Sequence, residues 1–548
     1  MKIIFDLETD GLLPDVSKVH CMAMTVEGAK AAQVFANEDG YDCLEQGLEI
    51  MSSAEGLIGH NIIGYDLPVL NKVLGWKPSK HTEISDTLVV SRLAYSHMMT
   101  VDAKKKYIPT KLYGSHSLKA WGYRLGMAKG DFNHETTDWS KFTDEMAGYC
   151  ANDVALTSIL FDHLRETECS DESIKLEHEF ARIIQRQVEN GFAFDVKKGQ
   201  ELYVSLLKRQ EELGNGLRNS YGSWFVSEGE ATPKVNNRKR GTSTGSTYTK
   251  IKRVDFNPNS RDHISRCLQQ KGWKPGEFTP NGKPKIDETV LGGLQLPHCK
   301  ELKEHFLISK RISQLAEGDN AWLKLEKDGR IFGNVNTNGA ITGRCTHSFP
   351  NVSQVPAGYS PFGKECRELF KASGNQVLVG CDADGLELRA LAGYLTRYDN
   401  GRYVTVAVEG SSKKGTDIHS LHQKLLGLKS RDTAKTFFYA FIYGAGNEKL
   451  GKILGTTITG GKKARMKLLD GVDGLLKLTE AVKQAYRRRG HLIGLDGRRL
   501  YVRSEHSALN TLLQSAGAVL MKKALVLLDE RLQFLGLDPG DDYEFVAN

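Results

Sequence analysis

Acidic residues near the N-terminus have a spacing that suits the binding of divalent metal ions. Asp6 and Glu8 are separated by one residue at the end of an apolar segment, residues 2–8, which predicts a strand that ends before Gly11. Successive side chains of a strand alternate, so both carboxylates point to one face. Such a pair holds a cation between its members, although a solvated strand edge explains the two acids equally well.

Two further segments favour the metal-binding interpretation. Asp66 follows a glycine turn in the segment 60–66, and Tyr149 precedes Asp153 by four residues, which places both on one face of a helix. Four acids can hold two Mg²⁺ ions, hard cations that prefer oxygen ligands, and Tyr149 can orient the attacking water. The pattern indicates two-metal hydrolysis of phosphodiesters. Asp86 is predicted to be a turn or cap residue rather than a ligand.

A second constellation suits phosphoryl transfer with a nucleoside triphosphate. Asp382 follows the apolar segment 376–381, which predicts a strand ending in a carboxylate, and residues 386–398 read as a helix. One predicted helix carries two cations and two aromatic residues every four residues, which form a single stripe. Cations suit the phosphates and rings suit the base and sugar. The stripe consists of Arg431, Lys435, Tyr439 and Tyr443, with His419 as a further phosphate donor.

Other polar residues suit contact with a duplex. Arg344 follows a glycine turn, and arginine can donate to minor-groove acceptors that every base pair presents at nearly the same place. A predicted helix from residue 509 carries Asn510 and Gln514 on one face, after a predicted hairpin at 494–499. Helical spacing also marks 172–219 and 300–327. The acid-free segment 233–254 is basic, and we expect residues 227–254 to form a mobile loop that touches DNA phosphates.

Composition is typical of a globular chain of several domains. The 548 residues are 40% hydrophobic and 26% charged, and the net charge of +7 permits a polyanionic partner. Nine scattered cysteines without a CxxC pair argue against a zinc site and for a reducing cytoplasm. No long apolar run or secretory signal is evident, so no membrane span is expected.

Together these segments resemble those of two enzyme families. Residues 1–165 resemble DnaQ-like 3′–5′ proofreading exonucleases with an RNase H-like fold. The rest of the chain resembles family A, Pol I-like DNA polymerases, particularly the replicative enzymes of T-seven-type podophages, on the strings "TGRCTHSFPNVSQVP", "RDTAKTFFYAFIYGAG" and "ALNTLLQSAGA". The resemblance implies an α/β and α+β multidomain architecture: a thumb with connecting helices at 166–325, with the short basic insertion 227–254, and palm and fingers at 326–548.

The resemblance implies a role for each matched residue. Asp382 and the carbonyl of Ala383 would bind a catalytic metal ion, Mg²⁺ or alternatively Mn²⁺, and Glu387 would exclude nucleotides with a 2′-hydroxyl. Primer–template DNA and dNTPs are the implied partners, in an infected bacterial cytoplasm, and a phage helicase–primase is a further candidate partner. The dNTP contacts would be His419, Arg431, Lys435 and Tyr439, and the DNA contacts Arg344, Tyr443, Gly444, Asn510 and Gln514.

Three departures from the family pattern stand out. Asp384 occupies a position where the family has a small polar residue, and it either adds charge near the metal ions or points to solvent. The insertion at 227–254 is short, which does not favour binding of host thioredoxin. The family's second metal-binding aspartate belongs to a His-Asp dipeptide after a strand resembling 543–547, and this sequence contains no His-Asp dipeptide.

We expect the missing aspartate to come from a second polypeptide of a split polymerase. A truncated sequence and a stand-alone 3′–5′ exonuclease with a DNA-gripping remainder are the alternatives, in that order. A non-catalytic DNA-binding protein is less favoured, because all four N-terminal acids are present.

Overall fold

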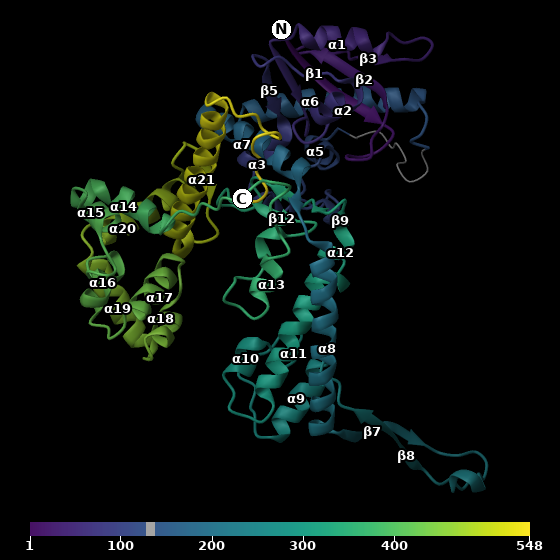
Figure 1. Ribbon diagram of the computed structural model, residues 1–548, viewed down its shortest axis with the longest axis vertical. Helices are drawn as coiled ribbons and strands as arrows, with labels where there is room; N and C mark the ends of the chain where they lie inside the picture. The colour runs from purple at the N-terminus through teal and green to yellow at the C-terminus, as the bar shows by residue number, and fades with distance from the viewer. Residues whose placement is uncertain (128–137) are drawn as a thin grey trace. The chain divides into compact units, whose positions relative to one another are not determined.

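The computed structural model describes residues 1–127 and 138–548 (Figure 1). These residues divide into two compact units. The predicted boundaries of the exonuclease-like, thumb and polymerase regions stay predictions. Unit 1 comprises residues 1–190, 335–346 and 380–546, and unit 2 comprises residues 191–334, 347–379 and 547–548.

The N-terminal part of unit 1 is a mixed sheet flanked by helices. The strand order is β3-β2-β1-β4-β5, in which β1 pairs antiparallel with β2 and parallel with β4. The elements are β1 (Lys2–Thr9), β2 (Val19–Val26), β3 (Gln33–Ala36), α1 (Leu44–Ser52), β4 (Gly56–Gly59), α2 (Asp66–Leu74), β5 (Glu83–Asp86), α3 (Thr87–Ala94), α4 (Met98–Asp102), η1 (Thr110–Leu112), α5 (Leu118–Leu125), α6 (Asp144–Arg165) and α7 (Asp171–Asn190). The predicted strand at 2–8 and the helix carrying residues 149–153 are confirmed.

Alternation along β1 decides which residues face α6. Phe5 is buried in a core that includes residues of α1, whereas Ile4 is buried in a separate core with Cys150 of α6. Side chains two residues apart share a face, so Asp6 and Glu8 lie on the α6 side of the sheet. The sheet and α6 therefore bring the two candidate metal-binding segments together.

The C-terminal part of unit 1 is mostly helical. Its core includes Phe437 and Phe438, both fully buried. The predicted helices at 386–398 and 431–442, the hairpin at 494–499 and the helix from 509 are confirmed. The elements are α14 (Leu386–Asp399), α15 (Arg402–Glu409), α16 (Ile418–Leu426), α17 (Arg431–Ile442), α18 (Asn447–Ile453), α19 (Ile458–Gly471), α20 (Leu475–Arg489), β13 (His491–Ile493), β14 (Arg499–Tyr501), η5 (Glu505–Ser507) and α21 (Ala508–Phe534).

The long helix α21 is apolar enough to bear on the expectation of no membrane span. Within the described residues, the segment Glu505–Phe534 is the one helix long and apolar enough to cross a membrane. Half of its most apolar 18-residue stretch is buried inside the structure. Lys522 of the same helix is paired with Glu177 of α7. A core helix of a globular unit has these properties, so the observation is weak evidence for a membrane span.

Burial of His422 predicts a pH dependence of stability. Burial, followed by the charge of His419, lowers the pKa of His422 to about 3, and its Nε2 lies 2.9 Å from the hydroxyl of Tyr403. Between pH 6.5 and 3 the unfolded chain binds a proton there and the folded chain does not, so stability falls as the pH falls. In His422→Gln the slope of unfolding free energy against pH, measured by denaturant titration, should decrease by about 1.4 kcal/mol per pH unit. Equal slopes for wild type and variant would contradict this.

Unit 2 is built on long helices with small sheets. Its buried clusters pack α8 against α11 and the short elements beside them. The elements at residues 191–379 are β6 (Phe192–Ala193), α8 (Val196–Tyr221), β7 (Ser223–Ala231), η2 (Arg238–Arg240), β8 (Tyr248–Asp255), α9 (Arg261–Gln270), α10 (Glu288–Gly292), α11 (Cys299–Ile312), η3 (Ser313–Glu317), α12 (Trp322–Leu325), β9 (Glu326–Lys327), β10 (Arg330–Ile331), β11 (Asn334–Asn336), β12 (Thr346–Ser348), η4 (Val352–Gln354) and α13 (Gly363–Arg367).

The prediction of a loop over the whole of residues 227–254 is wrong, because residues 227–231 and 248–254 belong to paired strands. Strands β7 and β8 pair antiparallel from Ser223 opposite Asp255 to Ala231 opposite Tyr248, with a register shift between Ser227 and Glu230. Most side chains on both faces of the hairpin are exposed. A strand without a buried face has no hydrophobic alternation, which is why its composition resembled that of a loop.

Two predicted strands are also absent from the structure. Residues 376–382 form no strand, and Val377 and Val379 are 80% and 87% exposed. Residues 543–547 form only an isolated bridge between Tyr543 and Pro539. A strand needs a neighbour to satisfy its backbone N–H and C=O groups, and no strand among the described residues pairs with either segment.

Candidate active sites

The first site is an acidic group between β1 and α6. One ligand atom from each of Asp6, Glu8 and Cys150 lies within 4.8 Å of the others. The Cys150 thiol donates to the backbone oxygen of Asp6 over 3.4 Å. Burial, then the neighbouring Cys21 and the charges of the two acids, raises the pKa of this thiol. A protonated thiol leaves two carboxylates as hard oxygen ligands, which fits Mg²⁺.

Asp66 joins this group from the start of α2. It is 3% exposed and accepts a hydrogen bond from the backbone of Leu7, the residue between Asp6 and Glu8. Burial, and secondarily the charge of Asp86, raises the pKa of Asp66. A buried carboxylate beside other acids is costly unless a cation compensates it, so the position favours a metal ligand.

Asp86 supports this site as a cap residue. As predicted, it caps α3, where its side chain accepts from the backbone N–H of Leu88. It also accepts from the backbone of Asn61 and Ile63, in the turn that leads to Asp66. The sequence predicts the cap, but not that the same carboxylate holds the turn that precedes a candidate ligand.

Helix α6 adds the remaining residues of the first site. Tyr149 and Asp153 are buried, at 7% and 4% exposure, and Asp153 lies three residues after Cys150 on the same helix face. Cys150 was not among the predicted site residues. Its position next to Tyr149 and three residues before Asp153 is the sequence feature that could have identified it as part of the site.

The second site lies around α17. The rings of Tyr439 and Tyr443 stack with centroids 6.2 Å apart, and His419 lies 5.7 Å from the ring of Tyr439. The hydroxyl of Tyr443 donates to Glu387 of α14 over 3.3 Å. Burial, then the charges of Glu387 and Asp384, raises the pKa of Tyr439. The predicted nucleotide-binding residues of α14, α16 and α17 therefore converge.

Arg431 at the start of α17 has a partner that the sequence analysis missed. Its guanidinium donates through Nε to Asp417 over 3.2 Å, and a second bond joins Nη2 to the same carboxylate. Burial alone would raise the pKa of Asp417, but bonds from Arg431 and Ser420 hold it well below its usual range. Asp417 thus fixes the orientation of Arg431, while Lys435 one turn later is exposed. No local pattern links positions 417 and 431.

Asp382 and Ala383 lie in the segment without secondary structure that precedes α14. Asp382 is exposed, and Asp384 sits in the turn that starts the helix, where Arg389 donates to its backbone oxygen over 2.8 Å. The side-chain charge of Asp384 acts on both Tyr439 and His419. Asp384 therefore places negative charge near Tyr439 and His419, while its own side chain is exposed to solvent.

The predicted DNA-contacting residues lie beside the second site. Arg344 is exposed, and its charge acts on the hydroxyl of Tyr443. Gly444 has a φ of +75° and ends α17, and a Cβ there would lie 3.4 Å from the backbone oxygen of His506. Asn510 and Gln514 are half-buried near the start of α21.

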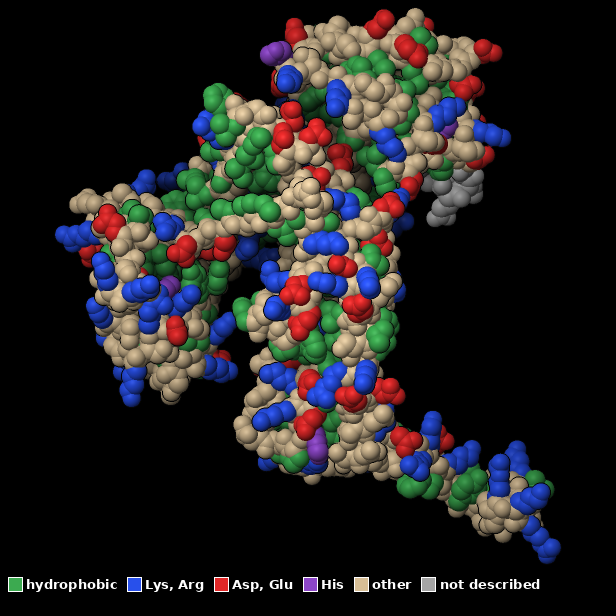
Figure 2. All heavy atoms as spheres, viewed as in Figure 1, with side chains coloured by type: hydrophobic (Ala, Val, Ile, Leu, Met, Phe, Trp, Pro, Cys, Tyr) green, Lys and Arg blue, Asp and Glu red, His purple; other side chains and the backbone are tan. Residues whose placement is uncertain are grey.

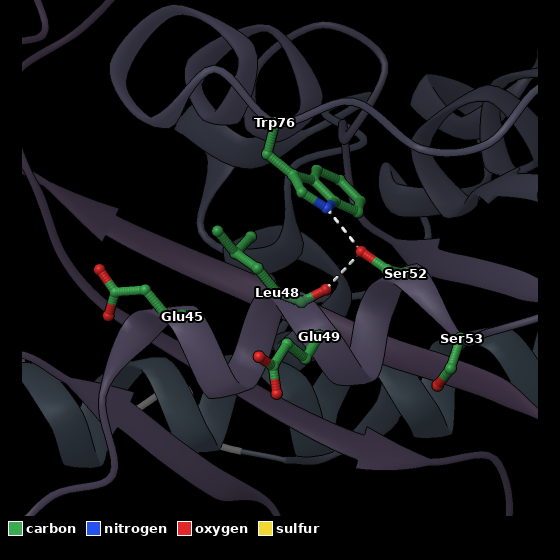
Figure 3. A pocket seen from close by; sticks show the side chains of 6 residues that line it. All are labelled: Glu45, Leu48, Glu49, Ser52, Ser53 and Trp76. Carbon is green, nitrogen blue, oxygen red and sulfur yellow. Dashed lines mark hydrogen bonds between the residues drawn. The ribbon is translucent and has the colours of Figure 1, made fainter.

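A shallow hollow on α1 contains none of the predicted site residues (Figure 3). It has a volume of about 530 Å³ and is lined by α1 and Trp76. The indole of Trp76 donates to Ser52 over 2.9 Å, and Ser52 donates to the backbone of Leu48 over 2.7 Å. Glu45 and Glu49 stand exposed at its rim, and they provide matched control positions for the acids of the first site.

The basic hairpin is the main charged feature of unit 2. Figure 2 shows lysine and arginine side chains along β7, β8 and the segment that joins them. Lys252 pairs with Glu228 over 3.7 Å and Arg253 with Asp255 over 3.1 Å. The remaining cations of residues 233–254 are exposed: Lys234, Arg238, Lys239, Arg240 and Lys250.

The sequence is similar to those of known proteins. The model of the DNA polymerase family A matches residues 233–538. The DNA-directed DNA polymerase of Escherichia phage T7 is 35% identical to this chain, over 99% of this chain and 92% of the relative. The corresponding enzyme of Enterobacteria phage T3 is 34% identical over the same shares.

More distant relatives share less. DNA polymerase I of Aquifex aeolicus is 25% identical over 90% of this chain and 80% of the relative. The thermostable DNA polymerase I of Thermus aquaticus is 28% identical over 51% of this chain and 36% of its own length. The alignment with the phage T7 enzyme has 653 positions and so exceeds the 548-residue chain, which means that parts of that relative have no counterpart here.

Proposed function

Because this chain belongs to the family A DNA polymerases and is a DNA-directed DNA polymerase, we propose that it copies a phage genome and corrects its own errors with a 3′–5′ exonuclease. The observation that carries the polymerase assignment is the 35% identity over 99% of the chain. The convergence of Glu387, His419 and Tyr439 at one site supports it. The experiment that tests it is extension of a labelled primer with Mg²⁺ and dNTPs, in the presence of a polypeptide that carries the His-Asp strand.

We propose specific roles for the residues of the second site. Arg431, Lys435 and His419 bind the triphosphate, and Asp417 keeps the Arg431 fork in position. Tyr439 contacts the sugar and Glu387 excludes a 2′-hydroxyl. Family A DNA polymerases use divalent metal ions, and Asp382 with the carbonyl of Ala383 would hold one. Such an ion would favour attack by the primer 3′-hydroxyl and stabilise the leaving pyrophosphate.

The hydroxyl of Tyr439 predicts ready incorporation of dideoxynucleotides. A hydroxyl beside the sugar can replace the hydrogen bond lost when a nucleotide lacks its own 3′-OH. Removing that bond in Tyr439→Phe should lower the use of a dideoxynucleotide relative to the dNTP by about 10- to 100-fold. Chain termination during primer extension measures this ratio. Tyr359→Phe, at an exposed tyrosine outside both sites, is the matched control, and chain termination unchanged by Tyr439→Phe would refute the role.

We propose that residues 1–165 are a DnaQ-like exonuclease domain. The mixed sheet with the order β3-β2-β1-β4-β5 supports an RNase H-like fold. The grouping of Asp6 and Glu8, with Asp66 bonded to the backbone of Leu7 and α6 packed beside them, supports a two-metal site. Tyr149 orients the attacking water and Asp153 completes the ligand set.

The basic hairpin is proposed to contact DNA without reading its sequence. Five exposed cations without an acid among them suit phosphates, and such contacts weaken as the salt concentration rises.

A second proposal concerns processivity. Because the hairpin is short, host thioredoxin is not expected to bind this chain. A pull-down with thioredoxin tests this expectation. A phage helicase–primase remains a candidate partner in the cytoplasm of the infected host.

Residues 166–325 are proposed to form the thumb with its connecting helices. Residues 326–548 are proposed to form the palm and fingers.

We also propose that a second polypeptide supplies the second metal-binding aspartate. The 548 residues contain no His-Asp dipeptide, and the apolar side chains of Val377 and Val379 stand exposed beside Asp382. An added strand would pair with this segment and cover it. Primer extension that appears only when a polypeptide with the His-Asp strand is added would support the proposal. Full extension by this chain alone would refute it.

The alternative function is a stand-alone 3′–5′ exonuclease whose C-terminal region grips DNA. The exposed, unpaired segment around Asp382 is the observation that favours it. Shortening of a labelled primer without extension, even after the His-Asp polypeptide is added, would support this alternative.

A further inference from the structure

A cluster of buried charges joins three segments of unit 1 that lie far apart in the sequence. Glu177 of α7 accepts from Lys522 of α21 over 2.6 Å and from Arg498 over 2.7 Å. Arg498, in the turn between β13 and β14, also binds Asp496 over 2.7 Å. The side chains of all four residues are 3% exposed or less. Two carboxylates and two cations balance, as buried charges must.

The cluster is poorly optimised for stability alone. Within the described protein, Arg498 Nη1, Glu177 Oε2 and Asn338 Nδ2 are buried without a hydrogen-bond partner. Buried charges lose their hydration, and each unpaired polar atom adds to that cost. A well-packed apolar group could fill the same space, so the position of these charges calls for another explanation.

Both cations of the cluster hold the turn that carries Arg344. Arg498 Nη1 lies so close to Gly343 that a Cβ there would meet it at 2.6 Å. Lys522 donates to Asn338 over 3.3 Å. The turn itself is tight, since Gly343 has a φ of +77° and its N–H donates to the oxygen of Ala340 over 2.8 Å.

The same cluster holds α21, which carries Asn510 and Gln514. Helix α21 lies beside α7, and Lys522 fixes it to Glu177 while its ammonium group sits 5.3 Å from the ring of Phe180. The turn of Arg344 and the helix of Asn510 are thus attached to a single carboxylate of α7.

We propose that Arg498 is a positioning residue for primer–template binding, which holds the Arg344 turn against α21 so that both contact one duplex. The inference rests on the proposed function, in which Arg344 is a DNA contact. Arg498 itself is buried and touches no DNA. Its planar fork reaches Asp496 and Glu177 at once and also lies close to Gly343, which the ammonium of lysine cannot do.

The test compares Arg498→Lys with wild type in metal-free buffer, where neither reaction proceeds. Fluorescence anisotropy of a labelled primer–template should show a Kd raised about 10-fold, equivalent to roughly 1.4 kcal/mol. The rate of single-stranded DNA degradation in Mg²⁺ should not change, because that site lies on the β1 sheet. Arg402→Lys, at an exposed pair with Asp473, is the matched control and should leave Kd unchanged.

A double-mutant cycle with Arg344→Ala separates positioning from general destabilisation. If Arg498 acts through Arg344, Arg498→Lys should add little to the loss already caused by Arg344→Ala. Losses that multiply would overturn the inference. If Arg344→Ala alone leaves Kd unchanged, the proposed DNA contact fails instead.

A second variant serves if Arg498→Lys does not fold. In Gly343→Ala the added Cβ displaces Arg498 Nη1, and the substitution strains a backbone with positive φ. It should raise Kd by a similar factor, again without adding to Arg344→Ala. A folded Gly343→Ala protein with unchanged Kd would overturn the inference.

Discussion

Replacing Asp6 and Glu8 together by alanine should reduce degradation of single-stranded DNA at least about 10³-fold. The two carboxylates share one face of β1 and lie within 4.8 Å of each other, so the variant removes the oxygen ligands of a metal ion at its centre. Release of nucleotides from a 3′-labelled oligonucleotide in Mg²⁺ measures the effect.

The matched control is Glu45→Ala with Glu49→Ala, which removes two exposed acids from the same domain. Degradation by the control should equal that of wild type. Activity retained by the Asp6 and Glu8 variant would show that the exonuclease assignment is wrong. Primer–template affinity should be similar in both variants, because these acids lie apart from the residues proposed to contact the duplex.

Replacing Asp382 by alanine should abolish primer extension, with a loss of at least about 10³-fold. Asp382 is the carboxylate proposed to hold the catalytic metal ion at the second site, and transfer to the primer depends on it. The assay is primer extension with Mg²⁺ and dNTPs in the presence of the His-Asp polypeptide.

Asp432→Ala provides the control for Asp382→Ala. Asp432 is an exposed acid at the start of α17, and the carboxylate that pairs with Arg431 is that of Asp417. Extension by this control should stay within about twofold of wild type, as for most surface substitutions. Unchanged extension by Asp382→Ala would place the catalytic carboxylate elsewhere, with Asp384 as the next candidate.

Local spacing made both candidate sites predictable. Asp6 and Glu8 alternate along β1, and Tyr149 and Asp153 are one turn apart on α6, so period alone placed each pair on one face. The stripe on α17 follows the same rule. These predictions need no knowledge of the rest of the fold.

Contacts between distant segments were not predictable. Lys522 and Glu177 are 345 positions apart, and Arg431 and Asp417 are 14 apart on different helices. Only the packing of α21 against α7, or of α17 against α16, brings them together. A sequence period describes one element at a time, so it does not reveal such pairs.

The errors in the strand predictions have physical causes. Residues 376–382 have the apolar composition of a buried strand, yet a strand forms only beside a partner, and the described residues offer none. The opposite error occurred at β7 and β8, where cross-strand pairing forms a hairpin with both faces in solvent. Pairing rather than hydrophobic pattern decided both cases.

The most direct test uses one labelled primer–template with Mg²⁺, with and without dNTPs, and with the His-Asp polypeptide present. Wild type, Asp6→Ala with Glu8→Ala, and Asp382→Ala are compared. If the two reactions occur at separate sites, the variant Asp6→Ala with Glu8→Ala should extend the primer without shortening it. Asp382→Ala should shorten the primer without extending it. Loss of both activities in either variant, with folding intact, would contradict the account.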